Sequence, residues 1–141
     1  MSSFEEVRAV IDNYHRFDDG LLLSFEMHYR KGQSLSASLL FFSRNHSLPG
    51  DEWRYVTLTV HGVKEVCTLL ESKVPLTGMV ICCGVKLLHL EGELCVDVDG
   101  AYDGINDPSS LQELRKDGTF YLIGESVAIR EELELDSDLT R

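Results

Sequence analysis

Apolar and polar residues alternate with a period of two over residues 21–30 and 53–61, which is typical of strands with one buried and one solvated face. In the first segment the apolar side also carries Met27 and Tyr29, whereas Glu26 and Arg30 fall on the polar side. The side chains that this pattern predicts to be buried are Leu21, Leu23, Phe25, Leu58 and Val60.

Apolar residues near the N-terminus recur instead at steps of three and four, which predicts an amphipathic helix over residues 3–15. Ser3 and Glu6 have the spacing of a capping box at its start. A second, short helix is expected after a serine cap at Ser109 or Ser110. The two helices therefore lie at opposite ends of a chain that is otherwise rich in strand patterns.

Further segments with strand patterns are residues 35–43, 63–71, 79–83, 85–90, 93–98, 119–124 and 127–135. Residues 63–71 are also compatible with a short helix, but a bulge at His61-Gly62 favours a continued strand. The connections are short, so neighbouring strands should be antiparallel. We expect one α+β domain over residues 1–135: a twisted antiparallel sheet of about eight strands, the N-terminal helix packed on one face, and a polar tail at 136–141.

The charge balance restricts the partners. Asp and Glu number 24 against 13 Lys and Arg, which gives a net charge of −11. This argues against nucleic acid and against anionic lipid as partners, because both require a basic surface. It permits a basic protein partner. The sequence begins with acids where a signal peptide carries lysine, and it contains no apolar run long enough for a membrane span, so a cytoplasmic location is expected.

The cysteines and histidines lack the spacings of metal ligands. Adjacent Cys82 and Cys83 would point to opposite faces of a strand, and no CxxC occurs. We expect Cys67, Cys82, Cys83 and Cys95 to be reduced, mostly buried thiols that form no disulfide. The run Asp97–Asp107 has the acids and glycines of a calcium loop, but its spacing does not fit one. No metal, cofactor or catalytic residue is therefore predicted.

One stretch of the chain is strongly biased in charge. Residues 87–114 contain seven carboxylates and no Lys or Arg, with Tyr102 in the middle. An acidic patch with an aromatic anchor is suited to binding a basic protein. The predicted partner-binding residues are Glu91, Glu93, Asp97, Asp99, Tyr102, Asp103 and Asp107. The alternatives are that this stretch is only a solvated loop, and that the strand aromatics Trp53 and Tyr55 form the interface.

Residues 17–25 (FDDGLLLSF) and 53–60 (WRYVTLTV), the latter leading into Gly62-Val63-Lys64-Glu65, carry a resemblance to a known class. With the short helix before them, they resemble the small single-domain immunity proteins of bacterial polymorphic toxin systems. The resemblance implies an acidic, cytoplasmic, bacterial protein that binds and neutralises a cognate toxin domain, with no catalysis of its own. It transfers no catalytic residue.

Two other classes of function remain open from the sequence. One is a β-rich cytosolic module that binds a small molecule or a subunit, and the other is an enzyme whose site carries no known motif. A deep apolar cavity with converging polar groups would favour the first. A pair of titratable groups with perturbed pKa values in such a cavity would favour the second. A toxin gene beside that of this chain would favour the immunity protein.

Overall fold

The computed structural model describes residues 3–29, 31–70, 78–102 and 107–134. Its elements are α1 (Phe4–Asn13), η1 (His15–Phe17), β1 (Leu21–His28), β2 (Ser36–Arg44), β3 (Trp53–His61), β4 (Glu65–Cys67), β5 (Met79–Val80), β6 (Val85–Leu90), β7 (Glu93–Val98), α2 (Leu111–Asp117), β8 (Tyr121–Gly124) and β9 (Ser126–Glu132). The polar tail at 136–141 lies outside the described residues.

The strands form two antiparallel sheets in place of the single sheet that we expected. One has five strands in the order β5-β1-β2-β3-β9, and the other has four in the order β4-β8-β7-β6. The α+β class, the antiparallel pairing, the N-terminal helix and the short later helix are confirmed. Strands β1, β2 and β3 follow one another as hairpins, and so do β6 and β7, whereas β5, β9 and β8 pair with β1, β3 and β4 from far along the chain.

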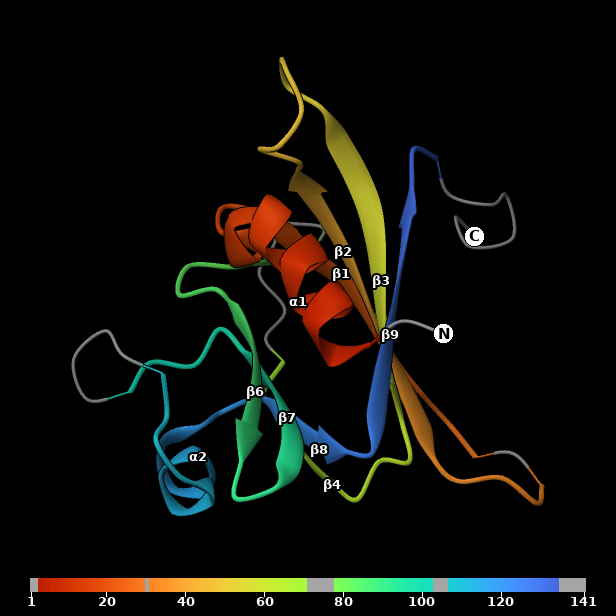
Figure 1. Cartoon of the computed structure of the whole chain (residues 1–141), viewed down its shortest axis with the longest axis vertical. Helices are drawn as coiled ribbons and strands as arrows, with labels where there is room; N and C mark the ends of the chain where they lie inside the picture. The colour runs from red at the N-terminus through yellow and green to blue at the C-terminus, as the bar shows by residue number, and fades with distance from the viewer. Residues whose placement is uncertain (1–2, 30, 71–77, 103–106, 135–141) are drawn as a thin grey trace.

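The main core lies between the two sheets and α1, which packs on the inner face of the five-stranded sheet (Figure 1). Val7 and Ile11 of α1 belong to the same buried cluster as Leu58 of β3, Val96 of β7 and Leu122 of β8. A second buried cluster joins the outer side of the four-stranded sheet to α2. Strands β7 and β8 are thus covered on both faces, whereas the five-stranded sheet is covered on one.

Both helices begin as the sequence predicts. The Ser3 Oγ accepts a hydrogen bond from the Glu6 N–H at 3.2 Å, and the Ser110 Oγ accepts one from the Glu113 N–H at 3.1 Å. Each cap satisfies a backbone donor that the first turn of a helix leaves without a partner. The cap of α2 settles the choice between the two serines in favour of Ser110.

Two chain segments pass from one sheet into the other. Strand β3 continues through Gly62 towards β4, and β8 continues through Glu125 into β9. The bent strands stay paired at the corner, where the Lys64 N–H donates to the Ile123 carbonyl at 2.8 Å and the Glu125 N–H donates to the His61 carbonyl at 2.9 Å. Gly62 has a φ of +65°, a conformation that side-chain-bearing residues seldom adopt. The strand favoured for 63–71 is present only over Glu65–Cys67.

A β-bulge in β1 changes which of its leucines are buried. Leu22 pairs with Phe41 and Ser24 pairs with Leu40, so Leu23 is an extra residue without a partner on β2. Leu22 is consequently 4% exposed and lies in the core. The predicted burial of Leu21 and Leu23 was wrong, because both side chains are only half-buried.

Beyond the bulge, the predicted alternation of buried and exposed side chains in β1 is confirmed in part. Phe25 packs against the core, with its ring 5.3 Å from that of Phe120, although it is not fully buried. Glu26 is exposed as expected, whereas Tyr29, predicted on the buried side, is 87% exposed. In β3, by contrast, the prediction is confirmed: Leu58 and Val60 are fully buried.

Candidate functional site

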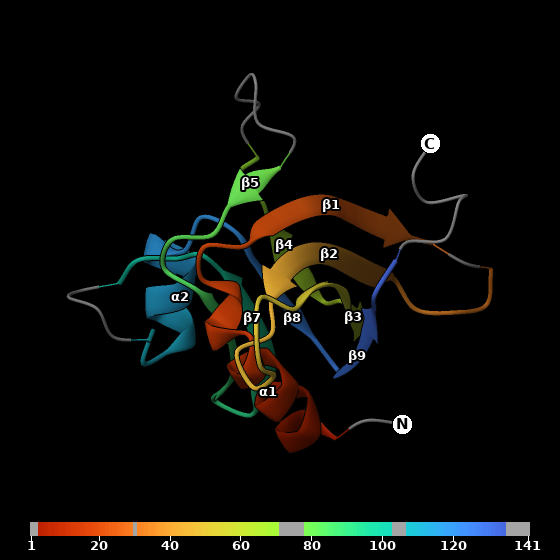
Figure 2. The same ribbon diagram turned by 90° about the horizontal axis from the view of Figure 1, so that it is seen from above.

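The outer face of the five-stranded sheet, opposite α1, is covered by no helix or strand of the described residues (Figures 1 and 2). We call it the open face. Antiparallel pairing places on it Leu21 and the even-numbered residues 24–28 of β1, the even-numbered residues of β2, the odd-numbered residues of β3 and the even-numbered residues of β9. The open face consists of two chemically different ends.

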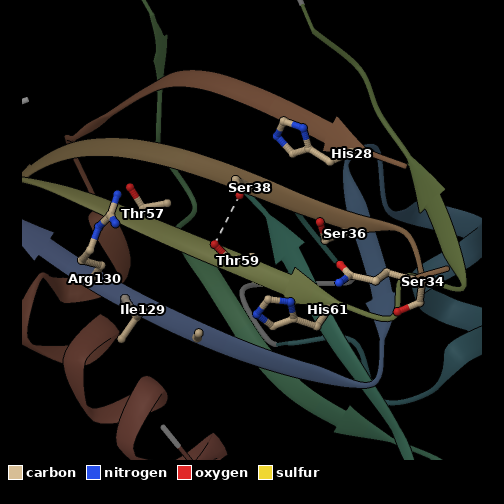
Figure 3. A pocket seen from close by; sticks show the side chains of 11 residues that line it. His28, Ser34, Ser36, Ser38, Thr57, Thr59, His61, Ile129 and Arg130 are labelled. Carbon is tan, nitrogen blue, oxygen red and sulfur yellow. Dashed lines mark hydrogen bonds between the residues drawn. The ribbon is translucent and has the colours of Figure 1, made fainter. Parts of the chain in front are cut away.

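One end of the open face is a polar hollow of about 720 Å³ (Figure 3). Its walls carry five hydroxyls, two imidazoles and one guanidinium, and its lining contains no carboxylate. The lining residues are His28, Gln33, Ser34, Ser36, Ser38, Thr57, Thr59, His61, Ala128, Ile129 and Arg130. The Ser38 and Thr59 hydroxyls are 3.2 Å apart and hydrogen-bonded across β2 and β3. The hollow therefore presents a ladder of hydroxyl groups in an otherwise acidic protein.

Two nitrogen-bearing side chains of this hollow lie close to carboxylates just outside it. The His28 Nε2 lies 3.4 Å from a Glu26 oxygen, and the Arg130 Nε lies 2.6 Å from a Glu132 oxygen. Among the residues that the structure describes, no hydrogen bond joins an imidazole of the hollow to one of its hydroxyls. The arrangement is suited to exchanging hydrogen bonds with a ligand or a protein surface. It lacks the base-activated hydroxyl of an acyl-transfer site.

The other end of the open face is aromatic. The Phe42 ring centroid lies 5.2 Å from that of Trp53 and 4.7 Å from that of Tyr55. Trp53 is 38% exposed. Beside these rings lies a shallow hollow of about 500 Å³, lined by Asp19, Leu21, Phe42 and Trp53. Phe42 was not singled out in the sequence, although its alternation with buried Phe41 marks it as the outward-facing member of the pair.

The structure places two of the predicted partner-binding residues in the interior. Asp97 is 0% exposed and Tyr102 is 5% exposed. The Tyr102 hydroxyl donates to Asp97 Oδ1 at 2.6 Å, and the Gly100 N–H donates to Asp97 Oδ2 at 3.2 Å. Lys86, also buried, has its Nζ 3.5 Å from Asp97 Oδ2 and donates to the Gly100 carbonyl at 2.6 Å. Asp97 and Tyr102 therefore form an internal ion-pair network and are corrected as surface residues.

Burial dominates the protonation of this network. It raises the pKa of Asp97, and the Tyr102 hydroxyl and the Lys86 ammonium oppose that shift by stabilising the carboxylate. The pKa of Tyr102 is raised far above its ordinary value by burial and by its bond to Asp97. This pairing is not predictable from the charge pattern, since Lys86 lies one residue outside the stretch that lacks cations.

The other predicted carboxylates lie nearer the surface, and each contacts a group of this chain. The Leu111 N–H at the start of α2 donates to Glu91 Oε2 at 2.9 Å. Glu93 accepts from the Lys64 Nζ at 3.0 Å, and Asp107 accepts from the Arg16 guanidinium at 3.1 Å.

Asp99 completes this set of internal contacts. Its Oδ1 accepts from the Cys82 N–H at 2.8 Å and also from the Cys83 N–H. Asp103 lies outside the described residues. The five described carboxylates at positions 91, 93, 97, 99 and 107 thus all make intramolecular contacts, and whether the exposed ones also bind a partner stays a prediction.

The cysteines depart from the expected burial. All four are free thiols, and Cys82 and Cys83 are exposed in the bend after β5, which ends at Val80. Only Cys95 is buried, and its burial raises its thiol pKa to about 11. The pKa of Cys82 is raised as well, by desolvation and by the nearby Asp99 carboxylate. A thiol with a raised pKa is a poor nucleophile at neutral pH.

One exposed ion pair joins α2 to β4. The Arg115 guanidinium donates to both oxygens of Glu65 at 2.9–3.2 Å, and the Tyr121 hydroxyl donates to Glu65 Oε2 at 2.9 Å. The hydrogen bonds from Arg115 are the main reason why the pKa of Glu65 is lowered. Burial and the Glu65 carboxylate raise the pKa of Tyr121 to about 12.

No family model, curated protein or solved structure matches this chain. Neither helix in the described part of the chain has the length and apolar character of a membrane-spanning segment. Across the same residues, no group of three or more His, Cys, Asp or Glu side chains is placed to hold a metal ion.

Proposed function

We propose that this chain is a non-catalytic binding protein that neutralises a toxin domain, and that the open face is its contact surface. The observation that supports this most directly is the aromatic end of that face. A sheet face left to solvent normally carries polar side chains, whereas this one presents Phe42, Trp53 and Tyr55. Aromatic residues are enriched at protein contacts and dominate their binding energy.

The hydroxyl ladder supports a protein partner in the same way. Protein interfaces have a polar rim that exchanges direct and water-mediated hydrogen bonds. Ser36, Ser38, Thr57 and Thr59 offer such bonds on β2 and β3, the two strands that also carry the aromatic cluster. The open face thus combines an aromatic end with a polar end that can exchange hydrogen bonds.

Two further observations favour a basic toxin domain as that partner. The net charge of −11 would steer a cationic protein toward this chain and speed their association. The segments that resemble immunity proteins are residues 17–25, which contain the acidic turn before β1 and the first part of that strand, and residues 53–60, which form most of β3. Two of the three aromatic residues, Trp53 and Tyr55, therefore lie in a segment that carries the resemblance.

The test is binding to the toxin domain encoded beside this chain's gene. We expect a complex with the native protein, protection of cells that express the toxin, and about tenfold or greater loss of affinity in Tyr55→Ala. Glu93→Gln with Asp107→Asn is the matched pair for the acidic stretch. A loss confined to that pair would move the contact surface to residues 91–107, and absence of both binding and protection would refute the proposal.

The polar hollow favours a second candidate, a module that binds a small polar molecule such as a sugar. Its volume suits a small ligand, but most such sites are more enclosed and more apolar. A thermal-shift screen with neutral sugars and polyols tests this candidate. A stabilisation that Thr59→Val abolishes, and that Tyr55→Ala leaves unchanged, would favour the module over the toxin inhibitor.

A further inference from the structure

The aromatic end of the open face is bordered by acidic residues that come from two distant parts of the sequence. Asp18 and Asp19 are separated from β1 by Gly20 alone, and Asp51 and Glu52 directly precede β3. Both strands are antiparallel to β2, which lies between them, so β1 and β3 run in the same direction. The beginnings of the two strands therefore lie at the same end of the sheet, and the two acidic pairs are brought there together.

The two Arg side chains on the described strands of the open face, Arg44 and Arg130, each lie close to a carboxylate. Arg44 of β2 pairs with Trp53 of β3. Its Nε lies 3.4 Å from an Asp51 oxygen, and its guanidinium donates to the Gly50 carbonyl at 3.3 Å. Arg130, further along the face, is paired with Glu132. No Lys or Arg of the described residues lies within ion-pair distance of Asp19, which lines the hollow beside Trp53. Beside the exposed Trp53 ring, this end of the open face thus carries more carboxylates than cations.

We propose that the hollow lined by Asp19, Leu21, Phe42 and Trp53 receives an arginine side chain of the partner protein. This inference rests on the proposed function and names the chemistry of its contact. A guanidinium can stack on the Trp53 ring, where the π-electron density attracts a cation. Its aliphatic stem can pack on Leu21, and its N–H groups can donate to the Asp19 carboxylate.

The single tryptophan allows this contact to be followed without the toxin. The chain contains one Trp, so its fluorescence reports on the hollow alone. The probes are the blocked tripeptide Ala-Arg-Ala and its citrulline counterpart, which has nearly the same shape but no charge. We expect a saturable change in emission with the arginine peptide at low salt, and about three- to tenfold weaker binding of the citrulline peptide. Equal responses to the two peptides would overturn the proposal.

Asp19→Asn is the sharpest variant. Asp19 has a φ of 62°, and asparagine tolerates that left-handed conformation well, so the turn before β1 should be retained. We expect this variant to lose the preference for arginine over citrulline. Asp117→Asn, at the exposed end of α2, changes the net charge equally and should keep the preference. If both variants lose it, the effect is one of overall charge and the hollow is not the site.

The toxin domain separates this inference from the proposed function. Binding that is weakened about tenfold by Asp19→Asn or Trp53→Ala, and little by Asp117→Asn, supports both. Binding that neither hollow variant changes leaves the proposed function standing and overturns the arginine contact. Recognition of the arginine peptide together with no binding of the toxin domain would support the arginine site and overturn the proposed function.

Discussion

Two acidic regions of this molecule use their carboxylates in opposite ways. In residues 91–107 the described carboxylates accept from a helix N-terminus, from Lys64, Lys86 and Arg16, and from backbone N–H groups. At the start of β1 and β3, by contrast, Asp18, Asp19 and Glu52 are exposed and only Asp51 is held by a cation. The first region is built into the fold and the second is available to a partner.

The difference shows that the charge of a sequence window does not predict the charge of a surface. The stretch without cations obtains them from residues 16, 64 and 86, all outside the window. An aromatic residue is equally ambiguous, since Tyr102 is buried against Asp97 whereas Trp53 is exposed beside Asp19. What distinguishes Asp97 and Tyr102 from Asp19 and Trp53 is that other parts of the chain pack over the first two.

Among the variants that test this comparison, Asp97→Asn is expected to have the largest effect on stability. The substitution leaves the Lys86 ammonium buried without a counter-charge, and breaking a buried pair in this way costs about 3–5 kcal/mol. We expect a loss of that size in the free energy of unfolding, measured by urea denaturation. The double variant Lys86→Met with Asp97→Asn should recover a large part of it. A loss below about 1 kcal/mol would mean that Asp97 is not a structural carboxylate.

Glu91→Gln tests the link between the acidic stretch and α2. Its side chain accepts the Leu111 N–H, and its negative charge lies at the positive end of the helix dipole. The amide keeps an acceptor but removes the charge, so we expect a loss of about 0.3–1 kcal/mol in unfolding free energy. Glu134→Gln, at an exposed position after β9, is the control and should have almost no effect.

Glu65 predicts how stability depends on pH. Its pKa in the folded protein is below the ordinary value of 4.5, so the contribution of the ion pair is fully present above that pH. The contribution is lost as the pH falls from 4.5 through the lowered folded-state pKa. Urea denaturation at pH 7 and at pH 3 should therefore show a smaller decrease in stability for Glu65→Gln than for the native chain. An identical decrease would show that Arg115 does not stabilise the carboxylate.

The smallest stability effect is expected at the open face. Asp19→Asn should change the free energy of unfolding by less than about 0.5 kcal/mol, because the carboxylate is exposed and has no cation of the described chain to pair with. The same variant should have a measurable effect on partner binding. Equal losses for Asp19→Asn and Asp97→Asn in urea would erase the distinction between the two acidic regions.

Much of the fold is predictable because its signals are local. The bounds of β3, β6 and β7 follow directly from alternation and turn residues, and both helix starts follow from serine caps. The bulge at Leu23 is less predictable, because residues 21–23 are all leucine. Either the odd-numbered or the even-numbered ones could then be the buried set. The division into two sheets depends on where β3 and β8 bend, and His61-Gly62 signalled that corner without revealing that the strands change sheets there.

The candidate site is harder to predict because it depends on what covers each element. Trp53 and Tyr55 were recognised as alternatives, but their exposure depends on α1 packing on the opposite face. The convergence of Asp18-Asp19 with Asp51-Glu52 follows only once β1 and β3 are both paired with β2. The burial of Asp97 likewise depends on α2 and on Tyr102, which pack over β7 from later in the chain.

The two bent segments that run through both sheets also bear on how the molecule opens. Because β3 leads directly into β4 and β8 leads directly into β9, separating either sheet from the core pulls on strands of the other. Native-state hydrogen exchange should therefore release the amides of β3 and β8 together, as one cooperative unit. The edge strand β5, which is two residues long and among the described strands pairs only with β1, can fray by itself. A partner seated on the open face would then slow exchange on both sides of the corner, well beyond the residues that it touches.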